Sequence, residues 1–431
     1  MLTAILGFAA LLTLCFVGFR VGFATLIVGF VGFALERGWH ASLSMVGVQV
    51  VEDAQNYNLS VIPLFILMGV FVYRSDVSRD LYDAAYAAMG RVRGGLALAT
   101  VLACGGFSAV CGSTLATAAT MAKVAMPQMK AWNYSDRLAA GTIAAGGTLG
   151  IMIPPSVPLV IYGIVAEVDI AQLFLAGVVP GLLLVALFML SVMFVVWRNP
   201  DAAPSSDPLP PERRKKAVRG ASPVLILFIV VLGGIYGGAF TATEASGIGA
   251  LGAAIIALSR GYLRTLNEWR VCLVETAITT SKIFIVLFGA VVFSQFINLS
   301  GLPYDILLFV AESEMSATQL VLFIIAIAIV MGMVFESIGI LVLLVPVFLP
   351  SLYAADVDMI WFGIIVVLVT EIGLITPPIG MNAFVVKSVI PQVKLRDIFI
   401  GITPYLFALL TGLILVFLFP AFATLVPNLA R

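Results

Sequence analysis

The sequence predicts an all-α polytopic membrane protein built from two related halves. Its residues are 61% hydrophobic and only 11% charged, whereas soluble domains have about 25% charged residues. Apolar runs of roughly 18 or more residues recur, and they are continuous rather than alternating, which predicts spanning helices instead of a β-barrel. A helix-breaking motif also occurs twice, as GIMIPPS at 150–156 and GLITPPI at 373–379.

Composition also argues against several classes of function. The formal net charge is zero, so no nucleic acid or other polyanionic partner is expected. The four cysteines show no CxxC spacing, and His40 is the single histidine, so metalloprotease and His-dependent serine protease chemistry are not expected. The first apolar stretch is too long for a cleavable signal peptide and lacks a basic start. We therefore expect a membrane protein that is not an enzyme.

The two halves follow one order of elements. Each begins with a helical pair, then an amphipathic stretch, a span and a polar interfacial stretch. An apolar segment interrupted by small polar residues follows, then a helix broken at Pro-Pro and a closing span. The expected ranges are 3–36, 59–73, 94–131, 136–165 and 171–197 in the first half, and 222–259, 281–297, 317–352, 359–390 and 399–419 in the second.

Loop charges predict how the interrupted segments cross the membrane. Lys and Arg are enriched in cytoplasmic loops, and both flanks of 94–131 are basic, which favours a re-entrant hairpin over two spans. Both flanks of 317–352 are acidic, which indicates a periplasmic location. Five spans and one hairpin per half also give an odd number of crossings. The sequence therefore predicts an inverted-topology repeat with about ten spans, two opposed re-entrant hairpins and periplasmic termini.

The connector between the halves is rich in proline and basic residues. It is predicted to be an extended cytoplasmic linker, and its prolines are Pro204, Pro208, Pro210 and Pro211. In the first half, the predicted division is scaffold and arm helices at 1–93, transport elements at 94–170 and a closing span at 171–197. The linker occupies 198–221. In the second half, scaffold and arm helices are predicted at 222–316, transport elements at 317–398, and a closing span with the C-terminus at 399–431.

The doubled helix break is the first candidate site. Pro154, Pro155, Pro377 and Pro378 lack amide donors, so each pair breaks its helix and frees backbone carbonyls. Such carbonyls suit a hard cation such as sodium. A packed kink is the alternative, but two breaks at equivalent positions favour an ion site. The glycines expected to let the chain turn are Gly147, Gly150, Gly373 and Gly380.

The predicted hairpin tips form the second candidate site. The first tip has Ser113 and Thr114 followed by Thr117 and Thr120, and the second has Ser337. Hydroxyls and helix N-termini that face a cavity suit an anionic carboxylate. Thr117 and Thr120 could instead form ordinary hydrogen bonds between helices.

Four polar residues lie near these segments. Glu336 would cost about 2.5–3.5 kcal/mol at a helix centre, so it needs a partner or a function. Asn382 follows the second break and is the preferred polar ligand. Lys387 could extend towards the cytoplasm, and Glu244 could hydrogen-bond the backbone. The sequence does not decide whether Glu336, Lys387 or Glu244 contacts substrate.

Motifs across nearly the whole chain resemble one family. The matching stretches are 111–118, 147–150 with 153–156, 233–238 with 243–245, and 371–382. They resemble the large membrane subunit of tripartite ATP-independent periplasmic (TRAP) transporters, the DctM-like family of the ion-transporter superfamily.

This resemblance implies an elevator-type secondary transporter in the bacterial inner membrane. A separate small transmembrane subunit and a periplasmic binding protein would be its partners. A sodium gradient would drive uptake of a small organic acid, such as a C4-dicarboxylate or a sugar acid, with no cofactor beyond sodium ions. A self-contained sodium/carboxylate symporter or an anion/proton antiporter is the alternative.

The resemblance also implies site residues. One sodium site would use Gly112, Ser113, Thr114, Gly147 and Gly150. The other would use Ser337, Gly339, Thr376 and Pro377. The substrate would contact Ser113, Thr114, Ser337 and Asn382.

Overall fold

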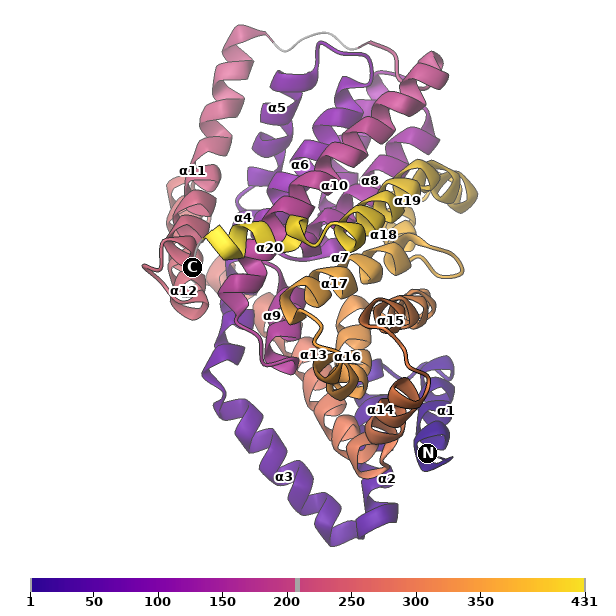
Figure 1. Ribbon diagram of the computed structural model, residues 1–431. Coiled ribbons are helices and arrows are strands. Elements are labelled where there is room, and N and C mark those ends of the chain that lie inside the picture. The colour runs from indigo at the N-terminus through magenta and orange to yellow at the C-terminus, as the bar shows by residue number, and fades with distance from the viewer. Residues whose placement is uncertain (1, 206–209, 430–431) are drawn as a thin grey trace.

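The computed structural model describes residues 2–205 and 210–429 (Figure 1). This described part contains 20 α-helices, two short 3-10 helices and no strand. Seven of its helices are long and apolar enough to cross a membrane, or up to eight when the bent pair α8 and α9 counts as one span. The all-α polytopic class is therefore confirmed.

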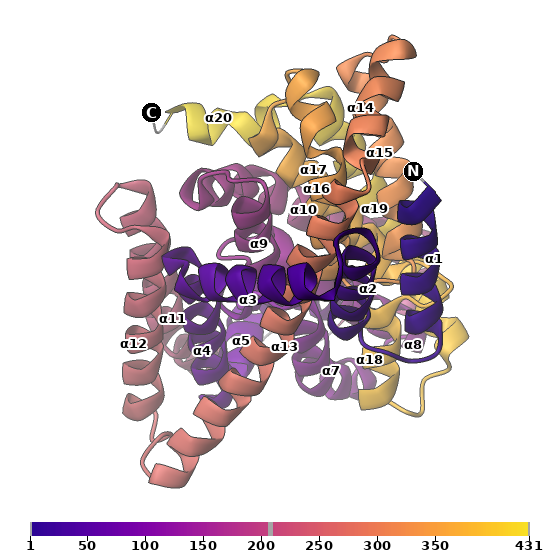
Figure 2. The same ribbon diagram turned by 90° about the horizontal axis from the view of Figure 1, so that it is seen from below.

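Five helices open the first half, and glycines with positive φ, Gly18 and Gly38, separate the first three. Gly38 ends α2 and precedes α3 with a φ of 91°, a value that favours glycine. Figure 2 shows α3 extending between α2 and α4. The helices are α1 (Leu2–Phe16), α2 (Val21–Arg37), α3 (Trp39–Gln55), α4 (Val61–Arg74) and α5 (Val77–Met89), with a 3-10 turn, η1 (Tyr57–Ser60), before α4.

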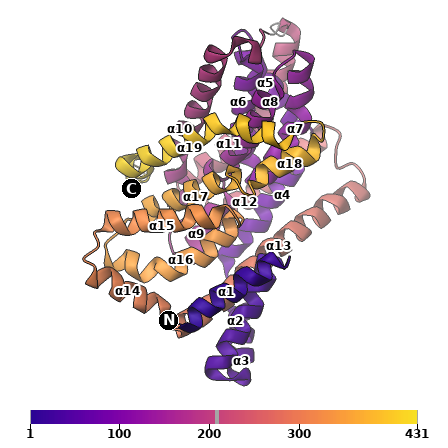
Figure 3. The same cartoon turned by 90° about the vertical axis from the view of Figure 1, so that its right-hand side faces the viewer.

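Each interrupted segment forms a helical hairpin. In the first, α6 (Gly95–Cys111) ends at Gly112, whose φ is 58°, and the Ser113 side chain caps α7 (Thr114–Ala131) by accepting from the Ala116 amide. In the second, α14 (Leu302–Glu312) precedes α15 (Ala317–Gly332) and α16 (Ser337–Ala354). Figure 3 shows α15 and α16 side by side. The predicted interruptions therefore become the hairpin tips.

Both Pro-Pro motifs interrupt a helix, as predicted. The first lies between α8 (Asp136–Met152) and α9 (Val157–Val165), which bend by 41°. The second lies between α17 (Met359–Ile375) and α18 (Met381–Val389). The Pro154–Pro155 and Pro377–Pro378 peptide bonds are cis.

The predicted turning role of the glycines is correct for Gly380 and wrong for the other three. Gly380 has a φ of 59° just before α18. Gly147, Gly150 and Gly373 lie inside helices α8 and α17. Their lack of a side chain lets neighbouring backbone approach these helices, as described below, so the reason for glycine is packing rather than a turn.

The predicted extended linker is partly wrong. The closing span α10 (Ile170–Arg198) leads into a short 3-10 turn, η2 (Pro200–Ala202), and α11 (Pro211–Tyr236) begins with proline at its first position. Residues 211–220 are therefore helical, because proline is tolerated there and the following Glu, Arg, Lys and Ala residues favour helix. Pro208 lies outside the described residues.

Four further helices complete the second half, together with the hairpin and the broken helix already described. They are α12 (Ala242–Ser259), α13 (Leu266–Leu299), the closing span α19 (Leu395–Leu418) and a short C-terminal helix α20 (Ala421–Leu429). In α13 the predicted amphipathic stretch and span form one continuous helix of 34 residues. The corresponding stretch of the first half is divided at η1 into α3 and α4.

The two halves exchange their short broken-helix segments. From the second half, α18 packs on α7 and α8, whereas α9 of the first half packs on α16 and α17. Each half therefore completes the surroundings of the other half's hairpin and broken helix.

Glycines permit the closest helix crossings. A Cβ at Gly29 of α2 would lie 2.6 Å from Phe293 Cα of α13, and one at Gly22 would lie 2.8 Å from the Ile285 carbonyl. Gly141 of α8 similarly contacts the backbone of Gly401 in α19. Small residues at helix interfaces allow this close packing within membranes.

Candidate functional site

The first predicted site is assembled around two glycines of α8. A Cβ at Gly150 would lie 3.1 Å from the Ser113 carbonyl carbon and 3.2 Å from the Thr114 amide nitrogen. A Cβ at Gly147 would lie 3.0 Å from the Thr114 carbonyl oxygen. The tip of the first hairpin therefore lies directly on α8, and the residues predicted to form this site come together.

The first helix break adds a carbonyl oxygen to this group. A Cβ at Gly112 would lie 3.1 Å from the Pro155 carbonyl oxygen. Pro154, Pro155 and Ser156 are all buried. The Ser156 hydroxyl donates to the Ile151 carbonyl at 2.5 Å and accepts from the Leu159 amide, so it joins the two sides of the break.

Asn382 reaches the same place from the second half. Its Nδ2 donates to the Ala144 carbonyl at 3.0 Å and lies 3.2 Å from where a Gly147 Cβ would be. Its Oδ1 is buried without a hydrogen-bond partner among the described residues, as are the hydroxyls of Thr114 and Thr117. Buried polar atoms are nearly always satisfied. Three such oxygens on α7 and α18 are therefore suited to contact a ligand.

The second predicted site is assembled less completely. Gly332, at the end of α15, contacts Gly373 of α17, and a Cβ at Gly332 would lie 2.9 Å from Gly373 Cα. This contact brings the second hairpin beside Thr376, whose hydroxyl donates to the Ile372 carbonyl at 2.5 Å. The Cβ direction of Gly339, however, faces Val21 of α2, at 3.5 Å from its Cγ1.

The two helix breaks differ in exposure. The first break is buried, whereas Pro377, Pro378 and Ile379 are exposed. Irregular backbone is stable at membrane depth only where protein or water, rather than lipid, surrounds it. The second break therefore lies on the surface of this chain, where either water or another protein must cover it.

The four predicted substrate ligands fall into two groups. Ser113, Thr114 and Asn382 gather at Gly147 and Gly150, as described above. Ser337 is buried at the start of α16, which packs on α9, α13, α14, α15 and α17. The first hairpin has largely different neighbours. Its second helix, α7, packs on α5, α8 and α18 as well as on α6 of the same hairpin.

Three charged residues left open by the sequence are now located. Lys387 Nζ donates to the carbonyls of Pro391 and Val393, at 2.6 and 2.9 Å, so it holds the loop after α18. Glu244 forms a capping box with Thr241 at the start of α12. Glu336 is exposed at the N-cap position of α16, and its side chain makes no capping hydrogen bond. The first two are therefore structural.

The structure also draws attention to Glu371 of α17. Its side chain is fully buried, and neither carboxylate oxygen has a hydrogen-bond partner among the described residues. A buried charge without partners is costly. The sequence places this residue in the second broken helix with Asn382 and Lys387, but it does not show that the carboxylate lacks partners.

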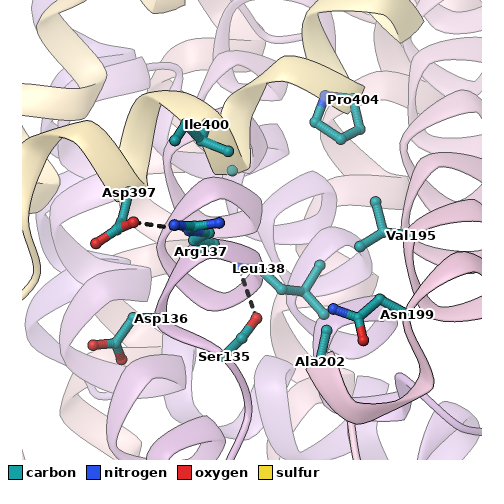
Figure 4. Close-up of a pocket in the computed structure, with 11 residues that line it drawn as sticks. Ser135, Asp136, Arg137, Leu138, Val195, Asn199, Ala202, Asp397, Ile400 and Pro404 are labelled. Carbon is teal, nitrogen blue, oxygen red and sulfur yellow. Dashed lines mark hydrogen bonds and ion pairs between the residues drawn. The ribbon is translucent and has the colours of Figure 1, made fainter.

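A separate cavity of about 580 Å³ lies between α8, α10 and α19 (Figure 4). Its polar side chains include Arg137 and Asp397, which form an ion pair at 2.8 Å. Gly147 lies ten residues along α8 from Arg137, which corresponds to about 15 Å. This cavity is therefore distinct from the site at the hairpin tips. No sequence signal pairs residues so far apart in the chain.

Two discontinuous helices, two helical hairpins and unpartnered buried oxygens beside the breaks define a membrane transport protein. A family model described as "Tripartite ATP-independent periplasmic transporter, DctM component" matches residues 6–422. The chain therefore belongs to the DctM family of TRAP transporter large permease subunits, which are multi-pass inner-membrane proteins.

Individual relatives agree with this family. The chain is 36% identical to the C4-dicarboxylate TRAP transporter large permease protein DctM of Pseudomonas aeruginosa, with 90% of each chain covered. It is 31% identical to the sialic acid TRAP transporter large permease protein SiaM of Vibrio cholerae, with 97% of each covered. The fold is similar to that of the Alcanivorax borkumensis YdaH transporter, with a TM-score of 0.61, 15% identity and 89% of each chain covered.

Proposed function

We propose that this chain is the permease of a sodium-driven TRAP transporter that takes up a small organic acid. The observation that carries the proposal is the cluster of buried, unpartnered oxygens where the first hairpin meets α8 and α18. Membership of the DctM family supports transport by a permease subunit. The coupling ion and the cargo rest on the chemistry of the site.

Sodium coupling is supported by the oxygen donors. Hard cations are held by oxygen ligands, including the carbonyls of discontinuous helices. The carbonyls of Thr114 and Pro155 and the hydroxyl of Thr114 all lie at the first hairpin tip. We propose that Gly112, Ser113, Thr114, Gly147 and Gly150 form one sodium site in this way. Gly147 and Gly150 contribute because they have no side chain, which lets the backbone of the first hairpin approach α8 closely.

A second sodium site is proposed at the second hairpin. Ser337, Gly339, Thr376 and Pro377 belong to it by analogy with the first. The contact between Gly332 and Gly373 supports their proximity. The exposed break at Pro377 gives this site access to water.

The cargo is proposed to be a small carboxylate. The named relatives transport a C4-dicarboxylate and sialic acid, and both compounds carry carboxylates. Hydroxyl and amide groups near helix N-termini suit such an anion. Ser113, Thr114, Ser337 and Asn382 are the proposed ligands, and a C4-dicarboxylate is the first candidate.

The mechanism is proposed to be an elevator built on an inverted repeat. The reciprocal packing of α9 and α18 on the other half's hairpin and broken helix supports two equivalent, oppositely oriented units. The difference in exposure between the two breaks supports access from one side at a time. A periplasmic binding protein and a separate small transmembrane subunit are the proposed partners.

Uptake by reconstituted vesicles tests this function. The chain with its small subunit and binding protein should accumulate carboxylate only with an inward sodium gradient. Ser113→Ala and Ser337→Ala should each lower sodium-dependent uptake by about tenfold or more, the loss expected for about 1.4 kcal/mol of binding. Unchanged uptake in both variants would refute the assignment. Uptake by this chain without a binding protein would instead identify a self-contained symporter.

A further inference from the structure

We propose that the cavity between α8, α10 and α19 binds the head group of a zwitterionic membrane phospholipid with a primary ammonium, such as phosphatidylethanolamine. Nothing in the transport site described above uses this cavity. Its volume of about 580 Å³ is large enough for a head group and its glycerol.

The position of the cavity favours a lipid over a soluble metabolite. Ile400, in its lining, begins an exposed apolar row along α19 that continues through Phe407, Ile414 and Leu418. These side chains are between 40% and 65% exposed. Apolar faces of spanning helices are covered by acyl chains in a bilayer, so the cavity lies at the end of a lipid-facing row.

The neighbouring helix marks the same level of the membrane. Trp197, near the end of α10, is 78% exposed and pairs with Phe194. Tryptophan is enriched at the boundary between acyl chains and head groups. Val195 and Asn199 from this part of α10 line the cavity. The cavity is therefore placed where a head group lies.

The charges around the cavity favour a zwitterion. Arg137 and Asp397 pair at 2.8 Å, and Asp136 pairs with Lys130 at 3.5 Å. The lining itself has one cation, Arg137, and two anions, Asp136 and Asp397, and Lys130 pairs with Asp136 from outside it. The lining therefore lacks the net positive charge that a site for an anionic lipid would have. Figure 4 shows Arg137 and Asp397 pointing towards each other at one side of the lining.

Each part of the head group has a counterpart. The Arg137 guanidinium has several donors and is the preferred group for a phosphate. The Asp136 and Asp397 carboxylates have spare acceptor positions for an ammonium that donates hydrogen bonds. A choline group has no N–H, so phosphatidylcholine would lose these bonds. The acyl chains would follow Ile400 and Phe407 along α19.

Native mass spectrometry of the complex with the small subunit tests the proposal. The complex is placed in nanodiscs that contain phosphatidylethanolamine, phosphatidylcholine or phosphatidylglycerol, and retained lipids are counted. Phosphatidylethanolamine should be retained about tenfold more than phosphatidylcholine, a difference equivalent to about 1.4 kcal/mol. Equal retention of these two lipids, or stronger retention of phosphatidylglycerol, would overturn the proposal.

Two variants localise the binding without altering the ion pairs. Ile400→Trp should fill the cavity and lower phosphatidylethanolamine retention about tenfold. Ile414→Trp, on the same exposed row and away from the cavity, should leave retention unchanged. If the two variants behave alike, the lipid is not in this cavity.

A competition experiment distinguishes the lipid from other occupants. Soluble phosphoethanolamine should not displace the lipid, because it lacks the chains that follow α19. Displacement by phosphoethanolamine at concentrations equal to those of the lipid would indicate a soluble metabolite instead. The Ile400→Trp variant is also measured with and without the small subunit. If it lowers lipid retention only when the subunit is absent, the subunit covers this face of the protein, and the proposal is refuted.

Discussion

Adding one methyl group at Gly147 tests the candidate site directly. A Cβ at this position would lie 2.9 Å from the Ala118 Cβ, 3.0 Å from the Thr114 carbonyl oxygen and 3.2 Å from Asn382 Nδ2. Gly147→Ala must therefore move the first hairpin, the side chain of Asn382 or both. These are the groups proposed to contact sodium and substrate.

The expected magnitude is a balance of two effects. Overpacking a close-packed site costs about 1–3 kcal/mol, whereas replacing glycine by alanine within a helix contributes about 0.5–1 kcal/mol of stability. The net loss should therefore be about 0–2.5 kcal/mol. If the displaced Thr114 carbonyl is a sodium ligand, sodium affinity should fall by about tenfold for each 1.4 kcal/mol.

Thermal unfolding in detergent with increasing sodium measures both effects. Gly147→Ala should lower the midpoint and require more sodium to raise it. The matched control is Gly233→Ala, also within a helix, where a Cβ would meet nothing within 4 Å. That variant should be as stable as the parent or more stable, with unchanged sodium dependence. If Gly147→Ala matched Gly233→Ala in midpoint and sodium response, the proposed site would be wrong.

Three further substitutions separate structural from ligand-binding roles. Asn382→Ala should lower uptake about tenfold while the protein still folds, and normal uptake would remove Asn382 from the site. Lys387→Met loses two hydrogen bonds to carbonyls and should lower stability by about 1 kcal/mol with the substrate KM unchanged; a raised KM with unchanged stability would reverse this assignment. Glu371→Gln should keep or raise the unfolding midpoint because it removes an ionisable group without partners, and a lower midpoint would indicate a partner for the carboxylate.

The features that the sequence predicts best are set by local chemistry. Pro154 and Pro377 remove backbone donors wherever they lie, so both helix breaks could be located from sequence alone. Gly112 and Ser113 combine a residue that ends one helix with one that caps the next, which explains why the first hairpin tip was also predictable.

The errors have physical reasons as well. Glycine serves both turns and close packing, and Gly147 and Gly150 serve the second purpose. Proline content predicts an extended linker, but Pro211 occupies the first position of a helix, where proline is favoured. The hydrogen bond between Asn382 and Ala144 joins distant parts of the chain. Its formation depends on the packing of α18 against α8, which no local pattern encodes.

The covalent reach of the chain between α10 and α11 limits how far the two halves can separate. The Ala202 carbonyl accepts from the Ser135 amide at 2.9 Å, and Ala203 is fully buried, so the end of α10 is fastened beside α8. About eight residues then lead to Pro211. A fully extended chain spans at most about 3.5 Å per residue, or about 28 Å in all. As long as the end of α10 stays bound to α8 by this hydrogen bond and packing, the start of α11 can lie no farther than this length from it.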